Sequence, residues 1–596
     1  MPTEERKGIW TDQDAPGREP TAAKDSFDVL VVGAGLEGGI IAACLARNGA
    51  RVMLLEEGGH PRTRLGESTT FTTQMTLRLI GERYRVPEVK YLASFEGTHS
   101  KVSTSGGVKR NFSFVHHRPD APQNPREVHM VVPPPIGFTQ NHYFRQDVDN
   151  WLLTLAARYG AQIRQQQRIT GVATDPDGIT VLRAGEAPLR AKYLVVTEDE
   201  RQDWARRLGV EESQARFRTH SRTLDTHMVG VTPFDEVAPK AAYRNPGRFH
   251  EGTLTHVFDG GWVSVIPFGN HVRATNQVCG VSLHLDPRKH PAAACPPEEE
   301  FHRVVSRYPD LARQFAGASP VRDWHRTERR QRSVTRSSGE RWSLVGPAAG
   351  VVDLLFSGGL STGLESTQVL LGRLIEAVRE DDFSPKRFRD VAELEQGLLD
   401  FTDDVCANAY LAFGDFDLWD VAYRVWCVSQ ILSHYEINRA YTKYRTDRDP
   451  VHLARVDNPW WQGRKLPQDG PYRSAMRFLQ HANERFQAIE AGDAVPAEVV
   501  AELRGLLAGA DFVPPVFGLG DPEMRYIDPP PHKVPLTLRW TRSTAPEDIG
   551  QLTRDGLLPF VRTRFARGEF EFAEELRNLA AGLPLVGRRF RVPAPE

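Results

Sequence analysis

The fold is decided by residues 27–56, which read FDVLVVGAGLEGGIIAACLARNGARVMLLE. The apolar run at 27–32 predicts a buried strand, and the small, apolar residues at 39–48 predict a helix that packs closely. Residues 51–56 predict a second strand. Strand, glycine turn, helix and strand in this order form the βαβ unit of a doubly wound sheet. The sequence therefore predicts the α/β class with a Rossmann-like domain.

The turn between the first strand and the helix is a GxGxxG sequence, residues 33–38. Gly33 permits the tight turn, Gly35 lets the backbone approach a pyrophosphate, and Gly38 lets the helix lie close to the strand. The helix N-terminus offers its free N–H groups to the phosphates. Glu56 ends the second strand and is placed to accept a hydrogen bond from a ribose hydroxyl. Because no second GxGxxG occurs, the sequence favours FAD, or FADH2 delivered by a separate reductase, over a dedicated NAD(P)H domain.

The remaining sequence predicts further regions around this unit. Residues 1–26 are polar and rich in Pro, Asp and Glu, which predicts a disordered leader. A helix is expected over 143–159, and strands are expected over 161–169, 194–197 and 341–345. The predicted domains are the leader, residues 1–26; an FAD-binding domain, residues 27–380, with a β-rich substrate domain inserted at roughly 90–142 and 206–335; and a helical C-terminal region, residues 381–596.

Composition narrows the class of partner. Lys and Arg number 75 against 77 Asp and Glu, so the chain has no bulk charge that would attract nucleic acid or an anionic membrane. The five cysteines form no CxxC pair, which argues against a disulfide framework, and no metal site is expected. This cysteine usage favours a cytoplasmic location. The sequence has no run of about 18 apolar residues that could span a bilayer.

Three motifs resemble the flavin-dependent halogenase family, within the larger class of single-FAD-domain monooxygenases. They are Leu65-Gly66-Glu67-Ser68, residues 145–149, and residues 345–350 leading to Phe356-Ser357-Gly358-Gly359. The resemblance covers roughly residues 1–380. In that family, reduced FAD and O2 oxidise a bound halide to hypohalous acid, which halogenates an aromatic carbon. The resemblance implies that FAD is held by Glu67, Arg145, Gly346 and Ala348.

The family's catalytic lysine, which activates or relays the oxidant, stands five residues before a phenylalanine on a strand. Lys109 has this spacing to Phe114, so the resemblance assigns the role to Lys109. A buried ammonium would donate a hydrogen bond to the oxidant or form a chloramine, and both roles need a desolvated, tuned amine. The alternative is a solvated lysine at a strand edge beside Arg110, since charged residues on strands are usually solvated.

The family's second signature, Trp-x-Trp-x-Ile-Pro, separates the flavin from the substrate and suppresses ordinary hydroxylation. Residues 262–267 read WVSVIP, so Trp262, Ile266 and Pro267 match, while Ser264 replaces the second tryptophan. Strand alternation predicts that the side chains of Trp262, Ser264 and Ile266 share one face. An ordinary apolar strand that ends at a proline is the alternative.

The third signature is the loop whose backbone N–H groups hold halide near the flavin ring. Ser357, Gly358 and Gly359 match this loop, and glycine suits a close backbone approach. Phe356 stands where tryptophan halogenases carry a glutamate, which resembles the members that act on phenols or pyrroles.

Together these features predict an FAD-dependent halogenase-like oxidoreductase that uses FADH2, O2 and halide. Its expected substrate is an activated, phenol- or pyrrole-like aromatic of secondary metabolism, free or tethered to a carrier protein, and its expected partner is a flavin reductase. Two alternatives stay open. One is a non-halogenating FAD-dependent monooxygenase or dehydrogenase, in which Ser264 opens the flavin to the substrate, and the other is a non-catalytic flavoprotein.

Overall fold

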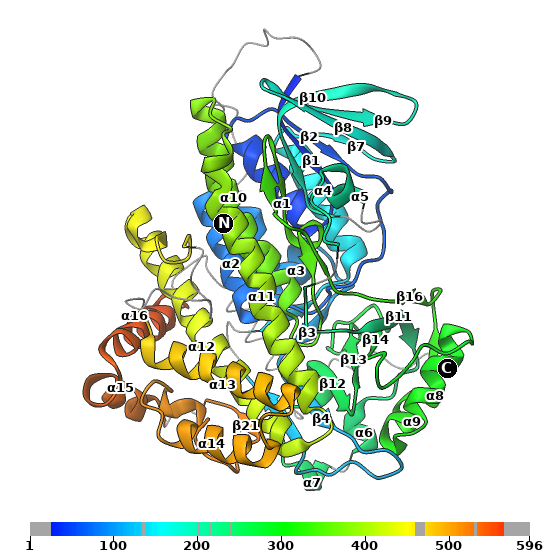
Figure 1. The fold of residues 1–596 in the computed structure, drawn as a ribbon, viewed down its shortest axis with the longest axis vertical. Helices are drawn as coiled ribbons and strands as arrows, with labels where there is room; N and C mark the ends of the chain where they lie inside the picture. Colours follow the sequence, from blue (N-terminus) through cyan, green and yellow to red (C-terminus); the bar gives the residue numbers. More distant parts are fainter. Residues whose placement is uncertain are drawn as a thin grey trace, which may run out of the picture.

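The computed structural model describes residues 26–133, 139–198, 203–213, 216–238, 240–458, 471–529 and 533–564. Figure 1 shows an α/β sheet at the top, a second sheet at the lower right and the C-terminal helices at the lower left. Residues 1–25 of the predicted leader lie outside the described residues, as do residues 565–596 of the C-terminal region.

The first sheet is the predicted doubly wound sheet. Its strands run in the order β18 (Ser338–Gly339), β19 (Trp342–Leu344), β10 (Glu186–Val196), β1 (Ser26–Val32), β2 (Val52–Leu55) and β7 (Gln162–Arg164), with β9 (Gly178–Arg183) and β8 (Ile169–Asp175) extending from β10. Strand β1 pairs in parallel with β10 and with β2, and Val29 lies opposite both Tyr193 and Val52. The α/β class is thereby confirmed.

Apolar side chains on both faces of β1 explain why this strand lies inside the sheet. Val29 and Val31 pack on the helix side, whereas Leu30 and Val32 pack with Trp204 of α5 (Asp203–Arg207) on the other side. A strand buried on both faces is expected to read as a continuous apolar run, as residues 29–32 do. The helices on the first side are α1 (Leu36–Arg47), α2 (Phe71–Arg83), α4 (Arg145–Arg158) and α10 (Gly358–Glu380).

The second sheet takes strands from both segments that were expected to be β-rich. Its order is β15 (Ser319–Pro320), β11 (Arg222–Val229), β14 (Cys279–Leu285), β13 (Gly261–Pro267), β12 (Thr253–Phe258), β4 (Phe112–His116), β5 (Val128–Val131) and β21 (Tyr526–Ile527), with β16 (His325–Thr327) beside β11. The short helices α6 (Phe234–Val237), α8 (Pro297–Val305) and α9 (Pro309–Phe315) pack on this sheet. Two further sheets have two strands each: β3 (Gly107–Lys109) with β6 (Gln140–His142), and β17 (Arg332–Ser333) with β20 (Gly350–Val351).

The C-terminal helices share a hydrophobic core with the second sheet. They are α11 (Arg389–Ala412), α12 (Phe416–Asp447), α13 (Arg473–Ala491), α14 (Pro496–Ala508), α15 (Val534–Ser543) and α16 (Glu547–Arg564). Phe114 of β4 and Trp262 of β13 belong to one buried cluster with Trp419, Tyr423 and Trp426 of α12. The aromatic residues of α12 therefore close over the strands that carry the second family signature.

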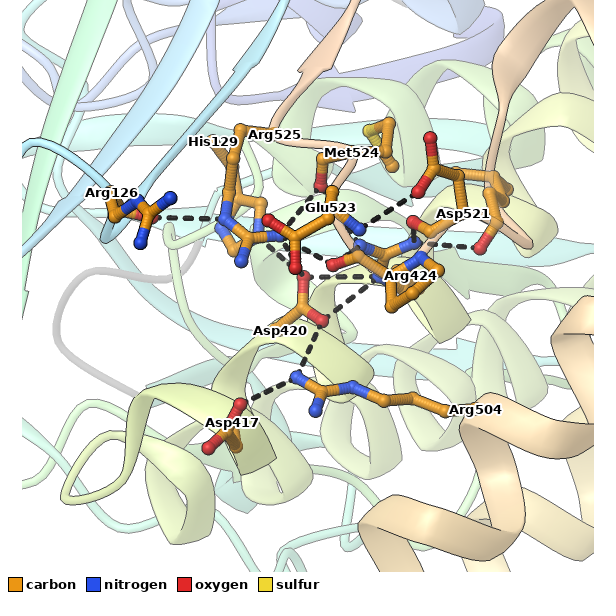
Figure 2. A network of polar contacts seen from close by, with 12 residues as sticks. Arg126, His129, Asp417, Asp420, Arg424, Arg504, Asp521, Glu523, Met524 and Arg525 are labelled. Atoms are coloured by element: carbon orange, nitrogen blue, oxygen red, sulfur yellow. Dashed lines mark hydrogen bonds and ion pairs between the residues drawn. The ribbon is translucent and has the colours of Figure 1, made fainter.

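A buried ionic network fastens the chain that follows α14, as Figure 2 shows. The guanidinium group of Arg424 donates hydrogen bonds to the backbone oxygens of Asp521 (2.7 Å) and Met524 (2.9 Å). Asp420 pairs with Arg424 at 3.0 Å and accepts a hydrogen bond from His129 of β5 at 2.9 Å. The network thus joins α12, the second sheet and the segment that enters β21.

Two local predictions differ from the structure. The strand expected over 161–169 ends at Arg164, because Gln166 adopts a left-handed backbone conformation with φ 59° that interrupts an extended chain. The segment expected to be β-rich at 90–142 also contains the helix α3 (Phe95–Lys101). Ser94 caps α3 by accepting a hydrogen bond from the N–H of Gly97 at 3.1 Å, a local signal that favours a helix start.

Candidate active site

A cavity of about 900 Å³ lies between the two sheets. Its volume is near the upper end of the range of roughly 300–1,000 Å³ that is typical of small-molecule sites. Charged side chains, among them Arg64, Arg145 and Glu198, line one part of it, whereas Leu355 and Leu399 line another part. The cavity can therefore hold a long molecule with an anionic portion and an apolar portion.

The GxGxxG turn has the predicted close packing. Gly33 has a φ of +95°, and a Cβ added at Gly38 would collide with the carbonyl oxygen of Gly33. Glu56 lies at the end of β2, where Oε2 accepts a hydrogen bond from the N–H of Ala34 at 2.8 Å. Glu56 therefore stabilises the turn from beneath, and its contact with a ribose stays a prediction.

A cluster of opposite charges lies directly over Gly35. A Cβ at Gly35 would collide with the carboxylate of Glu198, which pairs with Arg62 at 2.7 Å and also with Arg64. Burial opposes the charge on Glu198, yet Arg64 and Arg62 hold the pKa of this carboxyl below its usual value. The buried Nε and Nη1 of Arg62 have no hydrogen-bond partner among the described residues. Arg64 also lines the cavity, so this pair of cations places positive charge beside the glycine turn, which suits an anion.

Arg145 and Glu67 lie at the cavity wall. Arg145 forms a bidentate pair with Asp149 at 2.8 and 3.0 Å and donates to the backbone oxygen of Gly66 at 3.2 Å. Glu67 accepts a hydrogen bond from Nε2 of His227 at 2.8 Å. Each side chain is thus held by protein partners, and its contact with the cofactor stays a prediction.

Gly346 and Ala348, both predicted cofactor residues, occupy different places. Gly346 has a φ of +58° and lines the cavity. Ala348 is buried in the core with Trp342 and is not among the cavity residues. The carboxyl of Glu37 lies between Gly346 and Gly363, where burial raises its pKa to about 7.

Lys109 is buried, with 1% of its surface exposed, so the alternative of a solvated lysine is wrong. Its Nζ donates hydrogen bonds to Oγ of Ser68 at 2.8 Å and to the backbone oxygen of Thr69 at 2.7 Å. The Nζ atom lies 4.2 Å from the centroid of the Phe112 ring. Burial lowers the pKa of Lys109 to about 7, so a substantial fraction of the amine is neutral near pH 7. Ser68, which lines the cavity, connects the amine to it.

The signature strand β13 forms part of the cavity wall. Trp262, Ser264 and Ile266 all line the cavity, which confirms that they share one face. Ser264 lies within hydrogen-bonding distance of Ser282, 2.9 Å between the Oγ atoms, so the position of the family's second tryptophan is occupied by a pair of hydroxyls. Pro267 ends the strand, and its carbonyl oxygen accepts a hydrogen bond from Nδ1 of His142 at 2.8 Å.

The predicted halide loop begins the long helix α10. Ser357 adopts a left-handed conformation with φ 54°, and its hydroxyl donates to Oγ of Ser68 at 3.1 Å. Gly359 lines the cavity, and a Cβ added at Gly358 would meet open space. The first N–H groups of a helix lack intrahelical acceptors and carry partial positive charge, which suits an anion. Phe356 stacks on Trp426, with ring centroids 4.6 Å apart.

The chain matches the family described as FAD binding domain over residues 26–383. It is 39% identical to tetracycline 7-halogenase of Kitasatospora aureofaciens over 528 residues, which is 88% of this chain and 94% of that protein. The chain belongs to the flavin-dependent halogenase family. The chain is also 38% identical to monodechloroaminopyrrolnitrin halogenase PrnC of Pseudomonas fluorescens, over 84% of this chain and 88% of that protein.

A solved structure of another halogenase has the same fold as this chain. The halogenase PltM in complex with phloroglucinol and FAD superimposes with a TM-score of 0.79 at 28% identity, covering 84% of this chain and 99% of that chain. FAD is accordingly the cofactor of this flavin-dependent halogenase, which is an FAD-dependent oxidoreductase. The glycine turn, the carboxylate position over Gly35 and the cavity-lining Arg64 fit a dinucleotide.

Several contacts of this halogenase could not be found by sequence reasoning. Ser68 lies within a recognised motif, but no motif marks Thr253, whose Oγ1 lies 2.7 Å from Oγ of Ser68, or His142, whose Nε2 lies 2.9 Å from Thr253. Glu198 follows a predicted strand and Glu37 lies within the glycine turn, and no other feature of the sequence indicated that either residue lies in the site. Within the described ranges, no group of three or more His, Cys, Asp or Glu could hold a metal ion, and no helix is long and apolar enough to cross a membrane.

Proposed function

We propose that this halogenase uses reduced FAD, O2 and halide to halogenate a phenol- or pyrrole-like aromatic ring in secondary metabolism. The observation that carries the proposal is the buried amine of Lys109, joined through Ser68 to the loop at Ser357. When bound, reduced FAD would give two electrons to O2 and the halide would give two more, so that O2 is reduced to water and hypohalous acid. The protein must then hold this oxidant next to the aromatic carbon and away from water.

Lys109 is the residue proposed to direct the oxidant. Among the described residues, no carboxylate forms an ion pair with it, and burial alone lowers its pKa to about 7. As an ammonium it can donate a hydrogen bond to the oxidant, and as a neutral amine it can attack the halogen. A pKa near the working pH makes both forms available.

The proposed halide site is the start of α10. Gly358 and Gly359 offer backbone N–H groups, whereas the N–H of Ser357 is donated to the backbone oxygen of Leu354 at 2.9 Å, and the open space beside Gly358 leaves room for an anion. Trp262, Ile266 and Pro267 are proposed to form the wall between the flavin and the substrate, because Trp262 and Ile266 line the cavity and Trp262 also packs in the aromatic cluster with α12.

The substrate class rests on the relatives and on Phe356. The two relatives are named for tetracycline and monodechloroaminopyrrolnitrin, and the related PltM structure contains phloroglucinol. An apolar Phe356 supplies no charge to orient an unactivated ring, so the ring must be activated by its own hydroxyl or nitrogen. The non-halogenating alternative is not favoured, since both relatives are halogenases.

Reduced FAD is proposed to come from a separate flavin reductase, because the sequence has a single dinucleotide fingerprint. The substrate is either free or tethered to a carrier protein, and assays of both forms distinguish them. All five cysteines are free thiols, which agrees with a cytoplasmic location.

The test is an assay of the purified protein with FAD, a flavin reductase, NADH, bromide and phloroglucinol. We expect a brominated product whose rate falls at least about 100-fold in Lys109→Ala, whereas oxidation of reduced FAD continues. Arg110→Ala is the matched control, because Arg110 is the next residue and pairs with Glu251 instead. A hydroxylated product formed without halide would contradict the proposal.

A further inference from the structure

The hydroxyl of Ser68 is the centre of a buried hydrogen-bond chain. Its Oγ lies 2.8 Å from Nζ of Lys109, 3.1 Å from Oγ of Ser357 and 2.7 Å from Oγ1 of Thr253. Oγ1 of Thr253 lies 2.9 Å from Nε2 of His142. Four segments that are distant in sequence, at Ser68, His142, Thr253 and Ser357, therefore meet behind the amine of Lys109.

The contact between His142 and Pro267 fixes the direction of each hydrogen bond that links His142, Thr253 and Ser68. The carbonyl of Pro267 can only accept, so Nδ1 of His142 carries the hydrogen of their 2.8 Å contact. Burial lowers the pKa of His142 to about 3, so the ring is neutral and its Nε2 accepts the proton of Thr253. Thr253 must then accept from Ser68, whose only proton is thereby committed.

The oxygen of Ser68 consequently presents only lone pairs to the cavity side. It accepts from Lys109 and from Ser357 at once, and it cannot donate to either. We propose that Ser68, Thr253 and His142 form a positioning relay that holds the amine of Lys109 toward the Ser357 loop and sets its protonation. This inference rests on the proposed role of Lys109 in halogenation.

Other charged groups near these hydrogen-bonded residues have partners of their own. Glu67, which precedes Ser68, pairs with His227 at 2.8 Å, and Arg110, which follows Lys109, lies 3.6 Å from Glu251. The ring of Phe112 faces the amine and carries no charge. Within the described residues, His142 is therefore the titratable group that the relay connects to Lys109.

The relay should raise the pKa of Lys109. An oxygen that can only accept favours the ammonium form of Lys109, because hydrogen bonding to a charged form stabilises that form. Without Thr253, the proton of Ser68 is free to point at the neutral amine, which then becomes the favoured form. Loss of the relay therefore lowers the pKa of Lys109, and the amine becomes neutral at lower pH.

Thr253→Val is the direct test, because valine keeps the shape and removes the hydroxyl. Thr253→Ser should restore the relay. Thr255→Val is the matched control, since Thr255 lies two residues along the same strand and its buried hydroxyl has no hydrogen-bond partner among the described residues. The readout is the titration of Lys109 by NMR in protein labelled with 13C at the lysine Cε, with the signal assigned by its loss in Lys109→Ala.

We expect the midpoint of Lys109 to fall by about half a pH unit in Thr253→Val, as the net effect of one hydrogen bond. Thr253→Ser and Thr255→Val should titrate like the unchanged protein. His142→Leu breaks the relay at its other end and should shift the midpoint in the same direction. Midpoints that stay unchanged in both Thr253→Val and His142→Leu would overturn the relay.

Bromination of phloroglucinol, measured on the same proteins, separates this inference from the proposed function. The relay predicts that kcat falls about tenfold in Thr253→Val, with an acid limb moved to lower pH, whereas KM and the affinity for FAD stay unchanged. If Lys109→Ala keeps full bromination, the proposed role of Lys109 fails even where the titration shift is present. If only Lys109→Ala loses activity and no midpoint moves, the relay fails and the function stands.

Discussion

The indole ring of Trp262 lies parallel to the imidazole ring of His284, with centroids 3.9 Å apart and 7° between the planes. The indole Nε1 donates to the hydroxyl of Tyr410 at 2.9 Å, and this hydroxyl donates to Asp353 at 3.1 Å. Tyr410 belongs to α11. A helix of the C-terminal region therefore holds in place the first residue of the flavin-separating signature.

Tyr410→Phe tests this contact. The substitution leaves the buried N–H of Trp262 without its acceptor, so we expect the free energy of unfolding to fall by about 1–3 kcal/mol. Thermal unfolding of the variant measures the change. The share of hydroxylated product should also rise if Trp262 separates flavin and substrate as proposed. An unchanged unfolding midpoint together with an unchanged product ratio would contradict the prediction.

Lys109→Met should make the fold more stable below neutral pH. The unfolded lysine titrates near 10.5, but burial lowers its folded pKa to about 7, so folding below pH 7 buries a charge. That difference corresponds to a cost on the order of 5 kcal/mol below pH 7, which declines as pH rises toward 10.5. Denaturation of both proteins between pH 6 and 10 should therefore converge at alkaline pH. A constant difference across that range would be the contrary result.

Glu198→Ala should strengthen FAD binding. The carboxylate of Glu198 lies over Gly35 and pairs with Arg62 and Arg64, so it competes with a pyrophosphate for the same cations. We expect the dissociation constant of FAD, measured by quenching of flavin fluorescence, to fall about tenfold, which corresponds to one charged contact. Weaker binding in the variant would show that Glu198 supports the cofactor rather than competing with it.

Substitution of two glycines should differ in its effect, since one position tolerates a side chain and the other does not. Gly358→Ser places its Cβ in open space at the first turn of α10, so the thermal midpoint should stay within about 3 °C of the original value. Gly38→Ala places its Cβ against the carbonyl oxygen of Gly33, so we expect loss of FAD binding and of soluble protein. Expression, FAD content and thermal unfolding of the two variants provide the comparison. Equal behaviour would contradict the packing of the turn.

Arg424→Met should destabilise the protein far more than Arg504→Met. Arg424 is buried, and its loss takes one cation from Asp420 and leaves several backbone oxygens without their donor, at a cost of about 3–5 kcal/mol. Arg504 pairs with the exposed Asp417 at 2.7 Å and with Asp420 at 3.0 Å, but its guanidinium is partly exposed and Asp420 keeps Arg424 and His129 without it, so its loss should cost only about 1 kcal/mol. Urea denaturation at pH 7 measures both, and equal effects would contradict the network of Figure 2.

The same network has a pH dependence. Burial opposes the charge on Asp420, but His129 and Arg424 hold its pKa below the usual value. A carboxyl with a lowered folded pKa contributes stability above its unfolded pKa of about 4, and this stability is lost as pH falls. Asp420→Asn should therefore lower the unfolding midpoint at pH 7 and narrow its difference from the unchanged protein in acid.

The nucleotide-binding part was predictable because its signals are local. The glycine turn needs particular residues at fixed spacing, and β1 needs an apolar run, so residues 27–56 contain both in order. The interior of the site was less predictable, because its contacts join distant residues. Ser68 and Thr253 are 185 positions apart, and Trp262 and Tyr410 are 148 apart. Hydroxyls at such separations form no sequence pattern.

The sequence by itself determined the α/β fold, the dinucleotide turn and the three motifs that place this chain among the flavin-dependent halogenases. Backbone conformation depends on neighbours in the chain, and the sequence records those neighbours directly. Only the tertiary structure decided that Lys109 is buried, which hydroxyls face it and how α11 and α12 close over β13. Burial and hydrogen-bond direction depend on every segment that packs around a group, so they arise only when the chain has folded.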